Sequence, residues 1–271
     1  MKTVLPLPKA NQAQNQAKIS EIARLLKGCR NILFITGSGI SAESGLPTYR
    51  GIGGLYDDKT TEEGIPIEMA LAGEMLSTRP EITWKYLSQI EKNCRSATFN
   101  RAHEVIAQME RDFERVWVLT QNIDGFHRQA GSKNVIDIHG NLHNILCPAC
   151  GWRKTIKDFT EIDIPPHCPK CNTIARPDVV FFGEMLPEDK LALLMRELDR
   201  GFDIYFSIGT TSVFPYIRHP MAVAEHLRRP TVEINPGETE ISGWVEIKLP
   251  MGAAEALDGV WREYTSLRGG P

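Results

Sequence analysis

Short, almost continuously apolar runs alternate with amphipathic stretches along much of the chain. The apolar runs are residues 31–36, 115–119, 134–138, 203–208 and 231–234. Runs of this kind are typical of parallel strands that are buried on both faces. Apolar residues at helical spacing lie before, between or after them, in residues 19–26, 101–113, 187–199 and 217–227. Strand and helix in repetition predict an α/β fold with a Rossmann-like, doubly wound parallel sheet.

Two stretches break this alternation. Residues 55–100 show no strand pattern and predict a loop and short helices, and residues 141–177 hold four cysteines and several prolines. We expect them to form a smaller lobe from a helical module and a cysteine-containing module. The Rossmann-like domain then consists of residues 15–54, 101–140 and 178–271. Residues 1–14 are polar and predict a flexible N-terminal tail.

Composition and charge narrow the classes of partner. The 271 residues are 42% hydrophobic and 24% charged, with a net charge of −3. This balance gives no reason to expect a nucleic-acid or membrane partner. No apolar run approaches the ~20 residues that span a bilayer. The N-terminus has neither the apolar segment of a secretory signal nor the arginines of a mitochondrial presequence, so we expect a cytoplasmic protein.

Four of the six cysteines form two Cys-x-x-Cys pairs separated by seventeen residues, Cys147 with Cys150 and Cys168 with Cys171. Two such turns supply the four ligands of a tetrahedral zinc site. Because four thiolates leave no position for water, the predicted zinc is structural. Cys29 and Cys94 stand alone and are interpreted as small buried hydrophobic residues.

A glycine-rich turn follows the first apolar run. Gly37, Gly39 and Ala42 fit the dinucleotide-binding template, in which small residues let the backbone approach a pyrophosphate. A plain tight turn is the alternative. The acidic residue that usually holds the ribose about 20 residues later is missing. This absence disfavours a hydride-transfer dehydrogenase.

Polar side chains follow two further runs, Asn122 and Asp124 after one and His139 after the next. Ligands of open α/β sheets bind at the carboxyl ends of the strands, so these side chains should converge. Together they can hold a carboxamide, orient a ribose hydroxyl and accept a proton. Taken singly, each has a structural alternative: a turn cap for Asn122 and Asp124, and a hydrogen-bonded core histidine for His139.

In their order along the chain these motifs resemble the sirtuin family, over roughly residues 30–255. The matching segments are Thr36-Gly-Ser-Gly-Ile-Ser-Ala-Glu-Ser-Gly-Leu-Pro-Thr-Tyr-Arg-Gly51, Gln121-Asn-Ile-Asp124 with His127, His139-Gly140, the four paired cysteines, Arg176-Pro-Asp-Val-Val-Phe-Phe-Gly-Glu184, Gly209-Thr-Thr-Ser212 and Ile234-Asn235.

The resemblance implies an NAD-dependent protein lysine deacylase, first of all a deacetylase. NAD and an acyl-lysine peptide would meet in a cleft between the two lobes. The acyl oxygen would attack C1′ of the nicotinamide ribose and release nicotinamide. His139 would then act as general base on the ribose hydroxyls, and water would release lysine and O-acyl-ADP-ribose. Asn122 would orient the ribose, and Asp124 would bind the nicotinamide amide.

The resemblance also implies the contact residues. Those for NAD are Gly37, Ser38, Gly39, Ser41, Ala42, Tyr49, Arg50, Gln121, Asn122, Ile123, Asp124, Gly209, Thr210, Thr211, Ser212 and Asn235. The substrate peptide would add as a strand to Val179, Val180, Phe181, Phe182, Gly183 and Glu184.

Several positions depart from the family pattern. Ser38 replaces Ala, Tyr49 replaces Phe and Phe126 replaces Leu. The run after Thr210 is one residue shorter than usual, which leaves open whether Thr211 or Ser212 contacts NAD.

One departure bears on acyl selectivity. Members that prefer succinyl-lysine carry Tyr-x-x-Arg, and we matched this motif to Tyr86 and Gln89, which predicts a preference for neutral acyl groups. Mono-ADP-ribosyl transfer from the same pocket is the alternative activity. A silent NAD-binding module would lack His139 or the Asn-Ile-Asp set.

Overall fold

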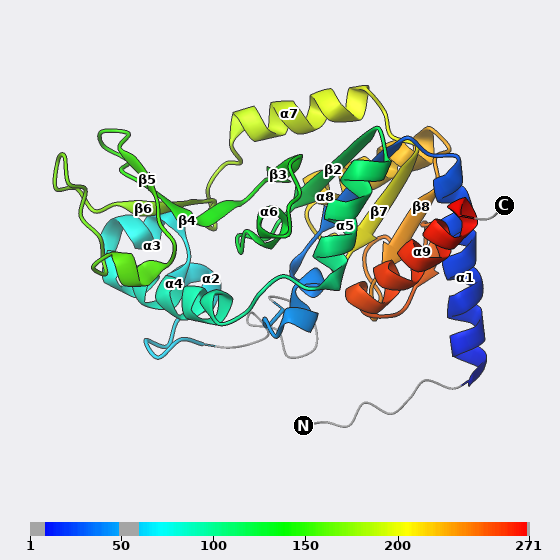
Figure 1. Ribbon diagram of the computed structural model, residues 1–271. Helices are drawn as coiled ribbons and strands as arrows, with labels where there is room; N and C mark the ends of the chain where they lie inside the picture. Colours follow the sequence, from blue (N-terminus) through cyan, green and yellow to red (C-terminus); the bar gives the residue numbers. More distant parts are fainter. Residues whose placement is uncertain (1–8, 49–59, 270–271) are drawn as a thin grey trace.

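Segments from the amino-terminal, central and carboxyl-terminal parts of the chain build one large parallel sheet. The computed structural model describes residues 9–48 and 60–269. The sheet has the strand order β3-β2-β1-β7-β8-β9, with every neighbouring pair parallel. Its strands are β1 (Asn31–Thr36), β2 (Arg115–Thr120), β3 (Val135–Asp137), β7 (Ile204–Ile208), β8 (Thr231–Ile234) and β9 (Ile247–Leu249). The predicted doubly wound sheet is confirmed (Figure 1).

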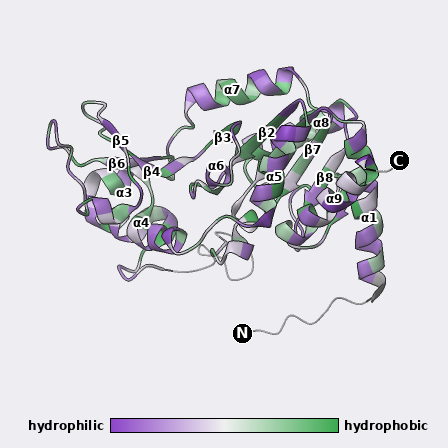
Figure 2. Ribbon diagram, in the orientation of Figure 1, coloured by the Kyte–Doolittle hydropathy of each residue, from purple (hydrophilic) through white to green (hydrophobic). Residues whose placement is uncertain are grey.

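Helices cover both faces of this sheet. On one face Ile32 and Phe34 of β1 share an apolar cluster with α1 (Lys9–Lys27), α5 (Arg101–Asp112) and α9 (Ala253–Arg268). On the other, Leu33 and Ile35 share a cluster with α7 (Glu188–Asp199) and α8 (Pro215–His226). Successive strand residues point to opposite faces, so a strand covered on both must be apolar throughout. Figure 2 shows this concentration of hydrophobic residues in the central strands.

The first helix begins earlier than the sequence analysis expected. Helix α1 starts at Lys9, so residues 9–14 are helical and not part of a tail. Ile19, Ile22 and Leu26 anchor the helix in the core. Once that part is packed, each added residue costs little, and Ala and Gln are good helix formers. Residues 1–8 lie outside the described residues.

Two carboxyl-terminal elements were not anticipated. Strand β9 holds only the run Ile247-Lys-Leu249, which is too short to show a periodicity. It pairs with β8 as an edge strand. Helix α9 packs its buried residues, among them Leu257 and Val260, against α1 and α5.

The two stretches that interrupt the alternation pack together as a small lobe. The first contains α2 (Ile67–Ala70), α3 (Gly73–Thr78) and α4 (Pro80–Arg95), and α4 has 16 residues where short helices were expected. The second contributes an antiparallel sheet with the order β5-β4-β6, made of β4 (Gly140–Leu146), β5 (Arg153–Thr155) and β6 (Arg176–Val179). Trp84 and Leu87 of α4 share an apolar cluster with Leu142 and Ile145 of β4. The exact boundaries between the predicted units stay a prediction.

Short helical turns fill the loops at the carboxyl edge of the large sheet and in the small lobe. They are η1 (Ser38–Ile40), η2 (Ala42–Ser44), α6 (Phe126–Gln129) and η3 (Phe159–Glu161). Among the helices of residues 9–48 and 60–269, none combines the length and the apolar composition that a membrane crossing needs.

Candidate active site

Two glycine-containing loops touch at the carboxyl edge of the large sheet. The Gly39 amide after β1 donates to the Gly209 carbonyl after β7, at 2.8 Å. A Cβ on Gly39 would lie 2.5 Å from the Gly209 Cα. A Cβ on Gly209, whose φ is +59°, would lie 2.4 Å from the Ile40 amide nitrogen. Only glycine fits either position, and bare backbone faces the adjoining cleft. Such a cradle fits the close approach of a pyrophosphate.

A cleft of about 880 Å³ opens beside this cradle. Its volume lies within the range of roughly 300–1,000 Å³ that is typical of small-molecule sites. Most of the expected contact residues line it: Gly37, Ser38, Gly39, Ala42, Gln121, Asn122, Ile123, His139, Val179, Val180, Phe181, Phe182, Gly183, Glu184, Gly209, Thr210, Thr211 and Asn235. Tyr49 and Arg50 lie outside the described residues.

His139 follows β3 and lines the cleft, and both of its ring nitrogens have partners within the chain. Its Nδ1 lies 3.0 Å from the carbonyl oxygen of Gln121, and its Nε2 lies 2.6 Å from the Tyr216 hydroxyl. A carbonyl oxygen can only accept, so Nδ1 carries the proton of the neutral ring. Nε2 is therefore the basic nitrogen of a half-buried ring that lines the cleft.

Asn122 and Asp124 belong to one buried network with Ser41. The Ser41 hydroxyl donates to Asp124 Oδ2 at 2.8 Å, and the Asn122 side-chain amide donates to Ser41 Oγ at 3.2 Å. Ser41 and Asp124 do not line the large cleft but a small adjoining pocket, which Asn122 also lines. Burial raises the pKa of Asp124, although hydrogen bonds from Phe126 and Ser41 oppose the shift.

The structure separates Thr211 from Ser212. Thr211 lines the cleft. Ser212 is buried, has a φ of +57° and lies 3.5 Å from the Ser207 hydroxyl through its own hydroxyl. Of the two residues left open by the sequence, Thr211 is placed to contact a ligand in the cleft.

Side chains tie the loops after β2, β7 and β8 to one another. The Gln121 amide donates to the Thr210 hydroxyl at 2.8 Å. The Asn235 amide donates to the Thr210 carbonyl at 3.2 Å. Residues that follow three different strands are thereby held in register around the cleft.

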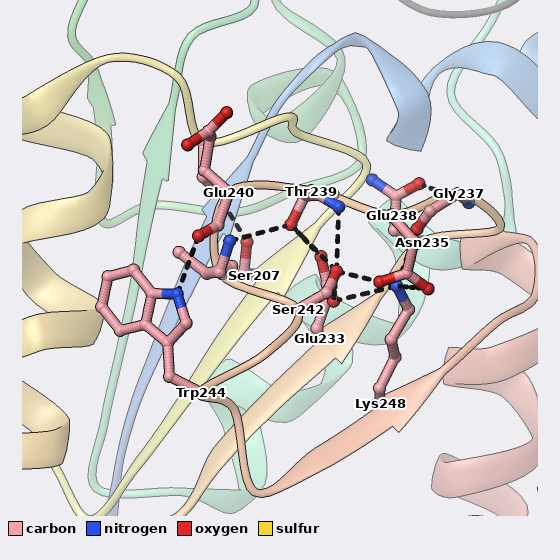
Figure 3. A network of polar contacts seen from close by, with 12 residues as sticks. Ser207, Glu233, Asn235, Gly237, Glu238, Thr239, Glu240, Ser242, Trp244 and Lys248 are labelled. Atoms are coloured by element: carbon pink, nitrogen blue, oxygen red, sulfur yellow. Dashed lines mark hydrogen bonds and ion pairs between the residues drawn. The ribbon is translucent and has the colours of Figure 1, made fainter.

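The loop after β8 is hydrogen-bonded to the buried carboxylate of Glu233, which the sequence analysis did not identify (Figure 3). Glu233 is fully buried on β8 and accepts hydrogen bonds from Thr239 and Ser242. Lys248 of β9 lies 3.5 Å from the same carboxylate and 2.8 Å from Glu238. Glu238 and Thr239 line the cleft beside Asn235. The network therefore fixes the part of the cleft wall next to Asn235, one of the expected NAD contacts.

His127, which belongs to the Asn-Ile-Asp motif, does not line the large cleft. It is buried, and its Nε2 lies 2.9 Å from the Thr36 hydroxyl. Burial holds the pKa of His127 well below its usual range, and burial likewise lowers the pKa of neighbouring His103 to about 4. Both rings are neutral core residues beneath the site.

The segment expected to bind peptide already makes backbone hydrogen bonds within the chain. The Val180 amide donates to the His139 carbonyl at 2.9 Å, and the Phe182 amide donates to the Leu71 carbonyl at 3.1 Å. Glu184 accepts from the Phe181 amide and pairs with both terminal nitrogens of Arg176. Residues 180–182 thus join the small lobe to the loop of His139, and strand addition by a peptide stays a prediction.

The four paired cysteines lie together in the small lobe. Their sulfur atoms all lie within 4.8 Å of one another, with 3.4 Å between Cys147 and Cys171 and 3.6 Å between Cys150 and Cys168. Thiolates at about 2.3 Å from a tetrahedral zinc ion stand about 3.8 Å apart. The cluster fits a zinc ion, as the spacing predicts.

Comparison with known proteins shows to which family the chain is related. The profile described as the Sir2 family matches residues 37–215. NAD-dependent protein deacylase 2 of Pseudomonas aeruginosa is 45% identical over 249 residues, which cover 91% of this chain and 97% of the relative. The chain belongs to the Sir2 family. An NAD-dependent protein deacylase of Aquifex aeolicus is 35% identical over 232 residues, covering 85% of this chain and 94% of the relative.

Solved Sir2 structures share the fold. A Sir2 homologue in complex with NAD has a TM-score of 0.79 at 32% identity, covering 94% of each chain. A complex described as Sir2, a p53 peptide and NAD has a TM-score of 0.77 at 30% identity, covering 91% of this chain and 98% of that one. The resemblance found in the sequence is thus confirmed at the level of family and fold.

Tyr86 and Gln89, which we matched to the family's Tyr-x-x-Arg motif, do not line the cleft of this Sir2 member. The Tyr86 hydroxyl donates to Glu63, and Gln89 is exposed. Leu87 and Ile90 are the residues of α4 that line the cleft. A helix turns by about 100° per residue, so a shift of one position moves a pair to another face. Leu87 and Ile90 are apolar at helical spacing, and this pattern was the signal in the sequence that could have indicated the inner face of α4.

Proposed function

We propose that this Sir2 chain is an NAD-dependent protein lysine deacylase in which His139 is the general base. The observation that carries the proposal is the position of His139. His139 lines the same cleft as the glycine cradle, and its basic Nε2 contacts the hydroxyl of Tyr216, which also lines the cleft. An imidazole titrates near neutral pH, which suits proton transfer from a sugar hydroxyl.

Other residues of the cleft and of the adjoining pocket would bind and orient the parts of NAD. The cradle of Gly37, Gly39 and Gly209 would hold the pyrophosphate of NAD. Asn122 would orient the ribose next to nicotinamide, and Asp124 would bind the nicotinamide amide in the adjoining pocket. When bound, NAD supplies the electrophilic ribose carbon that an acyl oxygen can attack. The named relatives carry the same activity in their descriptions.

The substrate would be an acyl-lysine in a peptide, with a neutral acyl group and acetyl first. Leu71, Leu87 and Ile90 give the small-lobe wall of the cleft an apolar lining. None of them can pair with the distal carboxylate of a succinyl group, so its burial there would be unfavourable. The corrected phase of α4 therefore supports the same preference on different residues. The zinc thiolates favour a reducing compartment, in keeping with a cytoplasmic location.

Mass spectrometry of an acyl-peptide panel, with and without NAD, tests the proposal. We expect NAD-dependent loss of the acetyl group, weaker turnover of succinyl-lysine, and release of O-acetyl-ADP-ribose. His139→Ala should lower the rate at least about 10²-fold, the usual worth of a general base. His226→Ala, an exposed residue at the end of α8, is the matched control. ADP-ribose retained on the protein acceptor would indicate mono-ADP-ribosyl transfer instead, and full activity of the His139 variant would refute the assigned base.

A further inference from the structure

An aromatic corner surrounds the ring of His139. The Phe214 and Tyr216 rings stack with their centroids 5.5 Å apart and an interplanar angle of 16°. Both meet the imidazole edge to face, at 6.1 Å and 5.9 Å between centroids. Both rings also line the cleft. The imidazole is therefore held in one orientation by its neighbours as well as by Gln121.

The start of α8 fixes where the Tyr216 hydroxyl lies. Residues 209–214 connect β7 to α8, and Pro215 is the first helical residue. Proline at this position presets the backbone of the first turn. Tyr216 in that turn places its hydroxyl 2.6 Å from His139 Nε2. The hydrogen bond between Tyr216 and His139 therefore depends on where β3 ends and where α8 begins.

The tautomer of His139 sets the direction of this hydrogen bond. Nδ1 faces the Gln121 carbonyl, which cannot donate, so the proton of the neutral ring is on Nδ1. Nε2 then offers a single lone pair in the ring plane, and the Tyr216 hydroxyl donates to it. A general base must present this same lone pair to the hydroxyl that it deprotonates. One lone pair cannot accept two well-aligned hydrogen bonds.

We propose that Tyr216 occupies the basic nitrogen of His139 in the cofactor-free protein and competes for it with a ribose hydroxyl of NAD. The inference rests on the proposed function, since it takes His139 as the base and the cleft as the NAD site. When NAD binds, a ribose hydroxyl replaces the Tyr216 hydroxyl as the hydrogen-bond donor to Nε2 of His139. Tyr216 thus acts on NAD binding and not on proton transfer: its hydroxyl must leave Nε2 before the ribose hydroxyl can bind, which lowers the affinity for NAD.

Removing the hydroxyl tests the competition. Tyr216→Phe keeps the aromatic corner, and we expect its Kd for NAD, measured by calorimetry, to fall about 3- to 10-fold, the worth of one net hydrogen bond. The rate of a single turnover at saturating NAD should stay within about twofold of the wild type, because the base itself is intact. Tyr264→Phe, a buried tyrosine of α9 whose hydroxyl accepts from Arg268, is the matched control and should leave the Kd unchanged.

A double-mutant cycle identifies the cause. In a His139→Ala background no hydrogen bond has to break, so Tyr216→Phe should change the Kd by less than about twofold. Equal tightening in both backgrounds would overturn the inference, as would a Kd of Tyr216→Phe that is unchanged or weaker. A lower single-turnover rate would also overturn it, because it would make the phenol part of the proton transfer. Failure of the proposed function is distinguishable, since the wild type would then not deacylate an acyl-peptide with NAD, whereas the effect of Tyr216→Phe on the Kd for NAD is measured without any turnover.

Discussion

At the scale of single residues, the site contains a carboxyl group in an environment that disfavours its charge. Asp124 is buried, and its hydrogen-bond donors are the Ser41 hydroxyl and the Phe126 amide, both neutral. Burial raises the pKa of Asp124. The stability linked to its neutral form is complete below the ordinary carboxyl pKa of about 4 and is lost as pH rises through the folded-state value. At neutral pH the residue therefore costs stability, which is typical of a functional group.

The substitution Asp124→Asn should raise the stability of the protein and lower its activity. Asparagine can accept from the Phe126 amide and donate to Ser41 without a buried charge. We expect the free energy of unfolding at pH 7 to rise by about 1–3 kcal/mol, while deacylation falls because the group expected to bind nicotinamide is altered. Urea unfolding between pH 8 and pH 5 measures the difference, which should shrink toward acid. A variant that is less stable than the wild type at pH 7 would contradict this.

At the scale of elements, the rotation of α4 about its axis decides which of its side chains line the cleft, where we propose that the acyl group binds. Leu87 and Ile90 line the cleft, whereas Gln89 is exposed. The helix is fixed in this phase because Trp84 and Leu87 pack into the small-lobe core. A substitution should therefore act on acyl selectivity only at the cleft-facing positions.

Ile90→Arg should shift selectivity toward acidic acyl groups. A guanidinium at this position can pair with the distal carboxylate of succinyl-lysine. We expect the succinyl-to-acetyl ratio of kcat/KM to rise at least tenfold, which corresponds to about 1.4 kcal/mol. Gln89→Arg adds the same charge one residue away and should leave the ratio unchanged. An equal response of both variants would mean that charge alone, and not the helix phase, sets the selectivity.

The cysteine cluster closes the small antiparallel sheet at its outer end. Cys147 follows β4, and Cys168 and Cys171 precede β6. Strand β5 has three exposed residues, so apolar burial contributes little to its pairing with β4. A metal that binds only the folded arrangement adds its binding energy to folding.

Removal of the metal should unfold this part of the lobe. We expect one zinc ion per chain by elemental analysis, and loss of both zinc and deacylation after treatment with a strong chelator. Limited proteolysis should then cut within residues 147–171. Cys168→Ser should behave like the chelated protein, whereas Cys29→Ser should retain zinc. Full activity of metal-free protein would contradict a structural role.

At the scale of the whole molecule, the site depends on contact between distant segments. The cradle joins the loop after β1 to the loop after β7, and residues 180–182 bridge the small lobe to the loop of His139. A ligand that binds across these loops binds only the folded chain, so it should stabilise the whole molecule.

NAD should stabilise the wild type and not a variant with a broken cradle. At a concentration of 100 times its Kd, NAD should add about 2.7 kcal/mol to the free energy of unfolding. Gly209→Ala should lower the melting temperature and abolish the NAD-dependent shift, because its Cβ would collide with the Ile40 amide. Gly243→Ala has open space around it and is the matched control. A normal NAD shift in Gly209→Ala would refute the proposed cradle.

The sequence by itself determined the parallel sheet, the glycine-rich turn, the zinc-ligand spacing and the segments that carry Asn122 and His139. These features are readable because each depends on neighbours within a few residues: the period of a strand or helix, the small size of Gly39, the spacing of Cys147 and Cys150. The resemblance to the sirtuin family rests on the same local motifs.

Only the tertiary structure decided which side chains meet in the cleft. It placed Leu87 and not Tyr86 at the wall, chose Thr211 over Ser212, and brought Tyr216 onto His139. Each outcome depends on the rotation of a helix or the closure of a loop, and these are set by packing against residues far away in the chain. Local sequence restricts backbone conformation, but long-range packing decides the direction of each side chain.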